Sequence, residues 1–186
     1  MLKYIEETGS YLEITGFSNI VIGDSKEFLK RIFKEQQQHV WVQFFDAGIV
    51  ATWQHLHFAV LNALLAFKNE RNISKSLAME AMLYASAQHQ IVRAIDLMGV
   101  KSDSANVAIV LIGESPDSIK AVLAEISEVI GAECNETVLE LSKNKVHRIR
   151  EAFHFTEKEL KAVIEKGNFE QALVKLVIER IALLST

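Results

Sequence analysis

The stretch TWQHLHFAVLNALLAFKNE, residues 52–70, decides how this chain folds. Its apolar side chains recur at three- and four-residue spacing, at Trp53, Leu56, Val60, Leu64 and Phe67, which predicts one continuous α-helix. Three more apolar residues cover much of the remaining circumference: Phe58, Leu61 and Leu65. A helix that is apolar on most sides is typically buried. We therefore expect residues 52–70 to form the central helix of the domain.

Short apolar stretches on either side of this helix predict the strands of a sheet. Val107–Ile112 is continuously apolar and is expected to be a strand. Further strands are expected at Leu2–Thr8 and Tyr11–Thr15, around a Gly9-Ser10 turn, at Val40–Phe45, and at Thr137–Leu141, where apolar and polar residues alternate.

Capping signals delimit the remaining helices. In Ser115-Pro116-Asp117 the serine can cap free amides, the proline has no N–H to satisfy, and the aspartate meets the positive helix end. That helix should end near Gly131. Others are expected from Asp24-Ser25 to about Gln38, over Leu77–Ala85, over Ile91–Met98 with Gly99 as C-cap, and in two or three segments after Ser142, the last at about Phe169–Leu184. The pattern predicts an α+β domain with a small mixed or antiparallel sheet and about seven helices.

Bulk composition is that of an intracellular globular protein. The 186 residues are 49% hydrophobic and 24% charged, which suits a single domain over residues 1–186 with a sizeable core. One cysteine, no apolar N-terminal stretch and no membrane-length apolar run predict a cytoplasmic protein that does not bind membranes. A net charge of −4 argues against a broad basic face, so any RNA contact must be local.

Short catalytic motifs are absent from the sequence. It contains no phosphate-binding loop, no serine hydrolase elbow and no zinc-binding spacing, so we expect no catalytic residue, no metal and no cofactor. Cys134 could act as a nucleophile with His147 or His154 as its base, but nothing in the local sequence distinguishes it from an inert thiol.

Three polar residues lie within the apolar helices, and each could have either a structural or a functional role. His55 and His57 lie about 200° apart around a helix and cannot chelate one ion together, so each is expected to be a hydrogen-bonded histidine. Glu80 is either a catalytic acid or a buried carboxylate that accepts hydrogen bonds from the amides of a neighbouring loop, and the second role is the more common one.

The expected terminal helix, Phe169–Leu184, is unusually apolar. Its apolar side chains spread well beyond the roughly 100° stripe that one core contact needs. Arg180 falls within this arc, where a guanidinium must be paired or must reach a partner's carboxylate. The alternatives are full burial inside the domain and an interface with a partner. For an interface, the candidate residues are Val174, Val177, Ile178, Arg180 and Ile181.

Two polar groups are candidates for RNA contact. The densest basic run comprises Lys143, Lys145, His147, Arg148 and Arg150, of which the first, third and last share one helix face. The second group, with side chains suited to unpaired bases, comprises Gln88, His89, Gln90 and Arg93. The alternatives are a solvated helix face and a capped helix start, respectively.

The segment from Asp46 to Ile112 resembles a known family. It contains DAGIVAT at 46–52, then His55 and Ala59 on a helix, then MEAMLYASAQHQIVRAIDLMGV at 79–100. This ordered pattern is similar to the TPRKB-like family, the kinase-binding subunit of the KEOPS complex. Thr15-Gly16-Phe17 and the apolar terminal helix also suit that family, so the resemblance covers most of the chain. The family's Glu, Ser, Gln and Ile positions fall on Glu80, Ser86, Gln90 and Ile91.

The resemblance implies an accessory subunit that binds and activates the small kinase-like ATPase of KEOPS. Another subunit of such a complex transfers a threonylcarbamoyl group to the adenosine beside the tRNA anticodon. The resemblance also implies that this subunit helps to hold tRNA through its unpaired CCA end. The residues expected to contact tRNA are then Gln88, His89, Gln90, Ile91, Arg93, Lys143, Lys145 and Arg148.

The sequence departs from the family pattern beside this expected RNA contact. Ala87 and His89 stand where many archaeal relatives have glycine and arginine, which should weaken the contact unless His89 or Arg93 compensates. Two other functions remain open from the sequence alone. One is a stand-alone small-molecule enzyme, and the other is a homodimeric structural protein that buries its last helix against a second copy.

Overall fold

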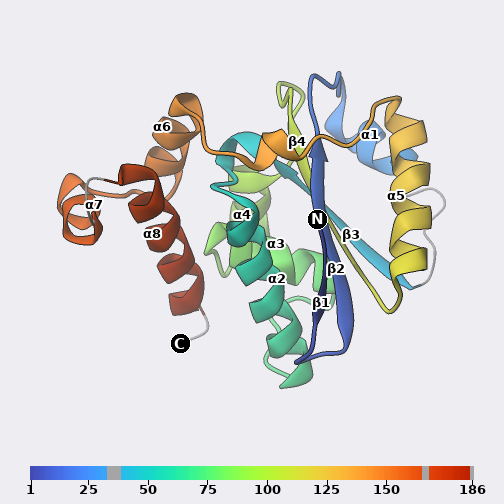
Figure 1. Cartoon of the computed structure of the whole chain (residues 1–186), viewed down its shortest axis with the longest axis horizontal. Coiled ribbons are helices and arrows are strands. Elements are labelled where there is room, and N and C mark those ends of the chain that lie inside the picture. Colours follow the sequence, from blue (N-terminus) through green and yellow to red (C-terminus); the bar gives the residue numbers. More distant parts are fainter. Residues whose placement is uncertain (33–38, 165–167, 185–186) are drawn as a thin grey trace.

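The computed structural model describes residues 1–32, 39–164 and 168–184. At its centre is an antiparallel sheet with the strand order β1-β2-β4-β3 (Figure 1). The strands are β1 (Leu2–Ile5), β2 (Ser10–Phe17), β3 (Val40–Asp46) and β4 (Val107–Gly113). Every residue of β4 is buried, because the strand lies between β2 and β3 and is covered on both faces. The α+β class and the antiparallel sheet expected from the sequence are confirmed.

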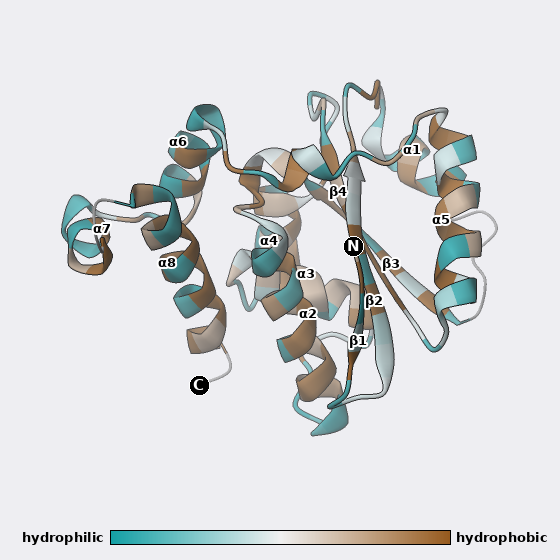
Figure 2. Ribbon diagram, viewed as in Figure 1, coloured by the Kyte–Doolittle hydropathy of each residue, from teal (hydrophilic) through white to brown (hydrophobic). Residues whose placement is uncertain are grey.

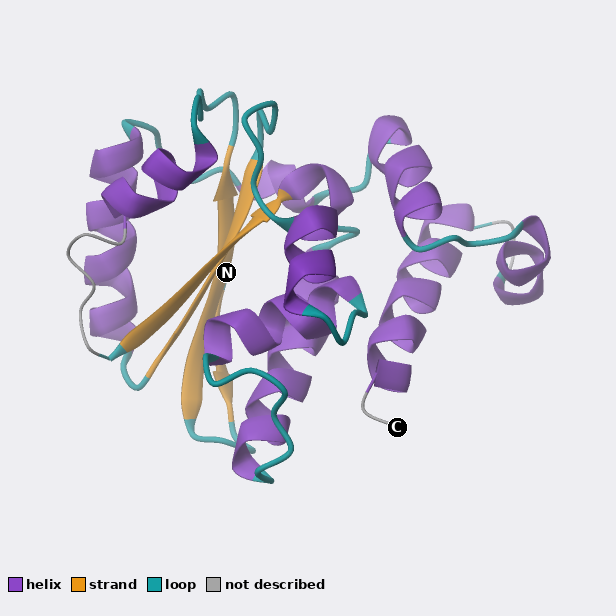
Figure 3. Ribbon diagram, turned by 180° about the vertical axis from the view of Figure 1, so that it is seen from behind, coloured by secondary structure: helices purple, strands orange, loops and turns teal. Residues whose placement is uncertain are grey.

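Helices form a layer on each face of the sheet, as Figure 3 shows from behind. One layer contains α1 (Ser25–Ile32) and α5 (Pro116–Ile130), and the other contains α2 (Trp53–Lys68), α3 (Leu77–Ser86) and α4 (Ile91–Met98). Hydrophobic and hydrophilic residues alternate along α5 (Figure 2), which buries Ile119, Val122 and Ile126. Its predicted cap is confirmed, because the Ser115 side chain accepts from the Ser118 amide.

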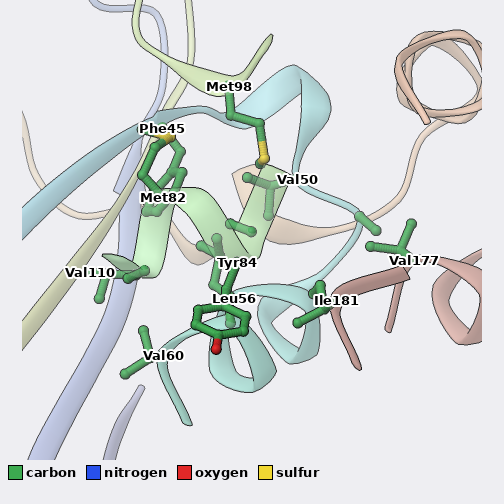
Figure 4. Packing of buried hydrophobic residues seen from close by; sticks show 14 of the residues in the cluster. Phe45, Val50, Leu56, Val60, Met82, Tyr84, Met98, Val110, Val177 and Ile181 are labelled. Atoms are coloured by element: carbon green, nitrogen blue, oxygen red, sulfur yellow. The ribbon is translucent and has the colours of Figure 1, made fainter. Parts of the chain in front are cut away.

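The predicted central helix is confirmed as α2. Leu56 and Val60 are fully buried, and they lie in one cluster with residues of β4, α3 and the terminal helix (Figure 4). Three further helices lie beyond α2 and α3: α6 (Lys143–Ala152), α7 (Glu157–Val163) and α8 (Phe169–Leu184). Helix α8 packs against α2 and α3, and both α6 and α7 contact α8. Buried residues of all three belong to the same cluster as one face of the sheet, so one core joins these helices to that face, and a second cluster lies on the other face.

Some sequence-based boundaries were wrong. The strand expected at Thr137–Leu141 is instead the 3₁₀ helix η3 (Glu136–Leu139), because the Asn135 side chain caps the Thr137 amide and turns the chain. The described chain contains eight α-helices, against about seven expected. The end of the helix expected to reach Gln38 lies outside the described residues. In the part of the chain that the structure describes, no helix is both long and apolar enough to span a membrane.

Candidate functional site

The terminal helix α8 divides its apolar arc between the protein core and the surface. Val177 and Ile181 are fully buried and point towards α2 in the core (Figure 4), so their side chains cannot reach a partner in this conformation. This corrects the sequence-based set of interface residues. Val174 and Ile178 are only partly buried and are the members of that set that remain available for a partner.

Val174 and Ile178 line a groove of about 610 Å³ between α8, the start of α2 and the segment after η3. The opposite wall of the groove is formed by Trp53, Gln54 and the segment Leu139–Leu141. Trp53 belongs to the apolar stripe in the sequence of α2, and no pattern in the sequence connects it with α8. Nothing in the pattern of residues 139–141 indicates that they meet α8, since this contact depends on where η3 leads the chain.

Arg180 is paired within the protein. Its guanidinium donates to Glu159 Oε1 at 2.7 Å and lies 5.6 Å from the centroid of the Phe155 ring. Glu159 also closes the capping box of α7 by accepting from the Thr156 amide, and this bond lowers the pKa of the Glu159 carboxyl. Arg180 therefore joins α8 to α7, which is one of the two roles that the sequence left open for it.

The segment between α3 and α4 presents most of the second polar group. Ala87 ends α3 in the left-handed conformation, with φ 50° and ψ 42°, and Gln90 is the N-cap of α4. His89, Gln90, Ile91 and Arg93 are exposed, and Gln88 is half-buried. Ile91 and Ile95 are 41% and 43% exposed, so α4 presents apolar surface beside its polar residues. These side chains are free to meet a ligand.

His89 lies at a second hollow, of about 540 Å³, beside the far end of α2. Side chains from four elements meet there, namely Asn62, Asn69, Arg71, Ile73, Tyr84 and Leu184. Arg71 and the two asparagines are not predicted from the sequence, because they follow or interrupt the apolar pattern of α2 without forming a motif of their own. Amides, an imidazole, a guanidinium and a phenol together can hydrogen-bond to and stack on unpaired bases.

The basic run on α6 is largely committed to the protein itself. Lys145 is 9% exposed, and its ammonium donates to the carbonyls of Val138 and Glu140 at 2.9 and 3.0 Å. Burial lowers the pKa of Lys145 to about 8. Arg148 donates to Asp46 Oδ2 at 2.7 Å. Lys145 is therefore not accessible to RNA in this conformation, which corrects its place among the expected RNA contacts. Lys143 is exposed and remains a candidate, whereas the guanidinium of Arg148 is engaged in its ion pair with Asp46.

The two RNA-binding groups predicted from the sequence lie at opposite ends of α8. His89 shares its hollow with Leu184, whereas Lys143 follows Leu141, which lines the groove beside Val174. Ten residues of helix separate Val174 from Leu184, or about 15 Å. The structure therefore does not bring the two groups into one patch.

His55 has a structural role in the core. Its Nδ1 accepts from the Ala51 amide at 3.1 Å, which leaves Nε2–H to donate to the Ala85 carbonyl at 2.7 Å. The side chain is fully buried, and this desolvation lowers its pKa to about 4. His57, two positions later, packs against Trp53 and Phe58. Both ring nitrogens of His55 are thus bonded to backbone groups.

Glu80 also has the structural role that was preferred from the sequence. Its carboxylate is fully buried and accepts from the Ile73 and Ser74 amides at 3.1 and 2.6 Å. Cys134 is exposed, with its sulfur 3.8 Å from Ser127 Oγ, and none of its described contacts is to a histidine. Within the described residues, no group of three or more His, Cys, Asp or Glu side chains is arranged to hold a metal ion.

Comparison with known proteins relates these surfaces to a family. The profile of the kinase binding protein CGI-121 family matches residues 17–185 of this chain. The chain belongs to the CGI-121 family. The regulatory protein Cgi121 of Methanocaldococcus jannaschii is 34% identical over 142 residues, which are 76% of this chain and 81% of that protein. The CGI-121 match confirms the family resemblance read from the sequence, and the matched range contains α8, the α3–α4 segment and α6.

The structure explains two small motifs of this CGI-121 family member. In Asp46-Ala-Gly48, the aspartate caps the 3₁₀ helix η2 (Ala47–Ile49) through the Gly48 amide while it pairs with Arg148. A Cβ at Gly48 would lie 1.7 Å from Arg148 Nη1, so glycine allows the guanidinium to approach. A Cβ at Gly16, in Thr15-Gly16-Phe17, would lie 2.3 Å from both the Val107 carbonyl and the Val138 side chain. Both motifs therefore position the C-terminal helices and η3.

Proposed function

We propose that this protein is a cytoplasmic accessory subunit of a KEOPS complex with no reaction of its own. In this role it binds and activates the kinase-like ATPase subunit and helps to recruit tRNA through its CCA end. The observation that carries the proposal is membership of a kinase-binding family over residues 17–185. The name of the archaeal relative, a regulatory protein, supports a regulatory role rather than a catalytic one.

The groove-facing side of α8 is the surface that we assign to the kinase-like subunit. Val174 and Ile178 offer apolar contact area there, whereas the core face of the same helix is occupied by α2 and α3. Apolar residues at the centre of an interface, surrounded by polar ones, are typical of protein partners. Glu140, Gln171 and Lys175 supply such polar surroundings.

The α3–α4 segment and the hollow beside His89 are the surface that we assign to the CCA end. Its side chains suit unpaired bases, and a small site of this kind is compatible with a chain whose net charge is −4. Exposed Ile91 and Val92 add apolar surface against which a base can pack. Lys143 lies at the other end of α8 and would contact a different part of the tRNA.

The alternative of a stand-alone enzyme loses two of its three candidate residues. The hydrogen bonds of His55 and the two of Glu80 go to backbone groups, and both side chains are fully buried. A catalytic acid or base must instead reach a substrate. We therefore assign both residues to the support of α2 and α3.

Co-purification with the cognate kinase-like subunit tests the kinase assignment. The wild type should form a stable complex and raise ATP hydrolysis, and Ile178→Glu should abolish both, because a carboxylate would be buried in an apolar contact. Val129→Glu, at an exposed site on α5 across the sheet, is the matched control and should behave as wild type. Thermal unfolding of each variant would show that it is folded. A wild type that forms no complex would refute the proposal.

A separate binding measurement tests the tRNA assignment. We expect tRNA that ends in CCA to bind more tightly than the same tRNA without those three nucleotides. Arg93→Ala should reduce the difference, whereas Lys120→Ala, which removes the same charge on α5, should preserve it. Equal binding of both tRNAs to the wild type would contradict the assignment while leaving the kinase proposal intact.

A further inference from the structure

We propose that the groove between α2, the η3–α6 segment and α8 binds a segment of the kinase-like subunit that presents an arginine or lysine between apolar side chains. This inference rests on the proposed function and specifies the part of the partner that is recognised. Three features of the groove carry it: its apolar lining, its unpartnered polar atoms and its acidic rim.

The lining of the groove selects apolar side chains. Apolar side chains from all three elements form it: Trp53, Leu139, Leu141, Val174 and Ile178. Its volume of about 610 Å³ falls within the range of pockets that hold compact ligands, so it can take a few side chains rather than a whole helix. A short segment that inserts apolar side chains therefore fits better than a flat protein surface.

Two polar atoms at the wall of the groove have no hydrogen-bond partner. Thr52 Oγ1 and Gln54 Oε1 are both shielded from solvent and unbonded, and the Thr52 hydroxyl does not cap α2. A buried polar atom without a hydrogen bond is unfavourable, because it has lost its bonds to water and gained none in the protein. Both residues are themselves only partly buried, so a rotation of either side chain can turn its polar atom towards the groove. An incoming segment with N–H and C=O groups would supply the missing bonds.

The rim of the groove selects positive charge. Glu140 and Glu170 are exposed on two sides of it, and Lys175 is the one cation among its lining residues. Carboxylates on both sides favour an arginine or lysine on the partner, while a partner segment with acidic residues would be repelled. Because the ion pairs would be near the surface, they should affect selectivity and association rate more than total affinity.

The test is the dissociation constant of the complex with the kinase-like subunit, measured at 0.1 M salt for matched variants. Glu140→Gln combined with Glu170→Gln should weaken binding roughly fivefold. The control is Glu128→Gln combined with Glu133→Gln, at exposed positions on α5 and just after it, which removes the same charge and should change binding by less than about twofold. Gln54→Met should weaken binding about threefold to tenfold, since it removes the unpartnered acceptor while preserving side-chain length.

A photo-cross-linker in place of Gln171, on the groove wall, identifies the occupant in the same complex. The expected product joins this position to a kinase peptide with an arginine or lysine beside apolar residues. Normal affinity in all the groove variants, or a cross-link to an acidic peptide or to a second copy of this chain, would overturn the inference but not the proposed function. Failure of the wild type to bind the kinase-like subunit would overturn both.

Discussion

The buried imidazole of His55 makes the stability of this protein sensitive to mild acid. The folded protein holds the ring in its neutral form, since Nδ1 must accept from the Ala51 amide and the side chain is fully buried. Protonation would remove that acceptor and place a charge in the core. We expect acidification to shift the folding equilibrium towards the unfolded state, in which the histidine is solvated and accepts a proton readily.

The size of the effect follows from two pKa values. The pKa of His55 is lowered to about 4 in the folded protein from an ordinary value of 6.5. The unfolded state therefore binds more protons between these values, and stability is lost as the pH falls below 6.5. Linkage gives a loss of about 2 kcal/mol between pH 7.5 and pH 5.0 from this residue alone.

Urea unfolding followed by circular dichroism at pH 7.5 and 5.0 measures this loss. His55→Gln replaces the imidazole with an amide that does not titrate but has both an acceptor and a donor. Contributions from all other groups cancel when the pH dependence of this variant is subtracted from that of the wild type. His89→Gln is the matched control, because His89 is exposed. The same loss of stability in wild type and His55→Gln would refute the reasoning.

Three further changes test other parts of the structure. Ala87→Gly should raise the free energy of unfolding by about 0.5–1 kcal/mol, because Ala87 adopts the left-handed conformation that glycine tolerates better. Ala85→Gly, within α3, is the control and should lower the free energy of unfolding. Thermal unfolding of both variants and the wild type measures these opposite changes. The pKa of Lys145 is about 8 in the folded state against 10.5 ordinarily, so wild-type stability should rise by roughly 1–2 kcal/mol between pH 8 and 10. Lys145→Met should lack that rise in urea titrations. Gly48→Ala should lower the free energy of unfolding by about 1 kcal/mol, because the new methyl group displaces Arg148 from Asp46. An equal loss of stability when Gly48→Ala is made in an Arg148→Ala background would contradict this explanation.

Much of the fold could be predicted because local signals coincide with tertiary structure. The apolar pattern of residues 52–70 identifies α2, and Ser115-Pro116 fixes the start of α5. The alternation at residues 137–141 led to the wrong prediction of a strand. An Asn135 cap and the packing of Val138 against Gly16 stabilise a 3₁₀ turn there, which the alternation alone does not reveal. Short patterns predict strands only where a neighbouring strand is available.

The candidate sites were less predictable than the fold. A helical wheel shows the wide apolar arc of α8, but it cannot show that α2 covers Val177 and leaves Ile178 beside a groove. The basic run in the sequence equally made Lys145 a candidate for RNA contact, whereas its ammonium donates to carbonyls of η3 and of the residue after it. Both errors have one cause: exposure is set by contacts between elements that are distant in sequence.

Hydrogen–deuterium exchange on the complex with the kinase-like subunit tests the central claim most directly. If the groove side of α8 binds that subunit, amides should become protected at the start of α2, in residues 138–141 and in the first half of α8. Amides of α1 and α5, across the sheet, should exchange as in the free protein. Protection confined to α1 and α5, with the groove unchanged, would contradict the account.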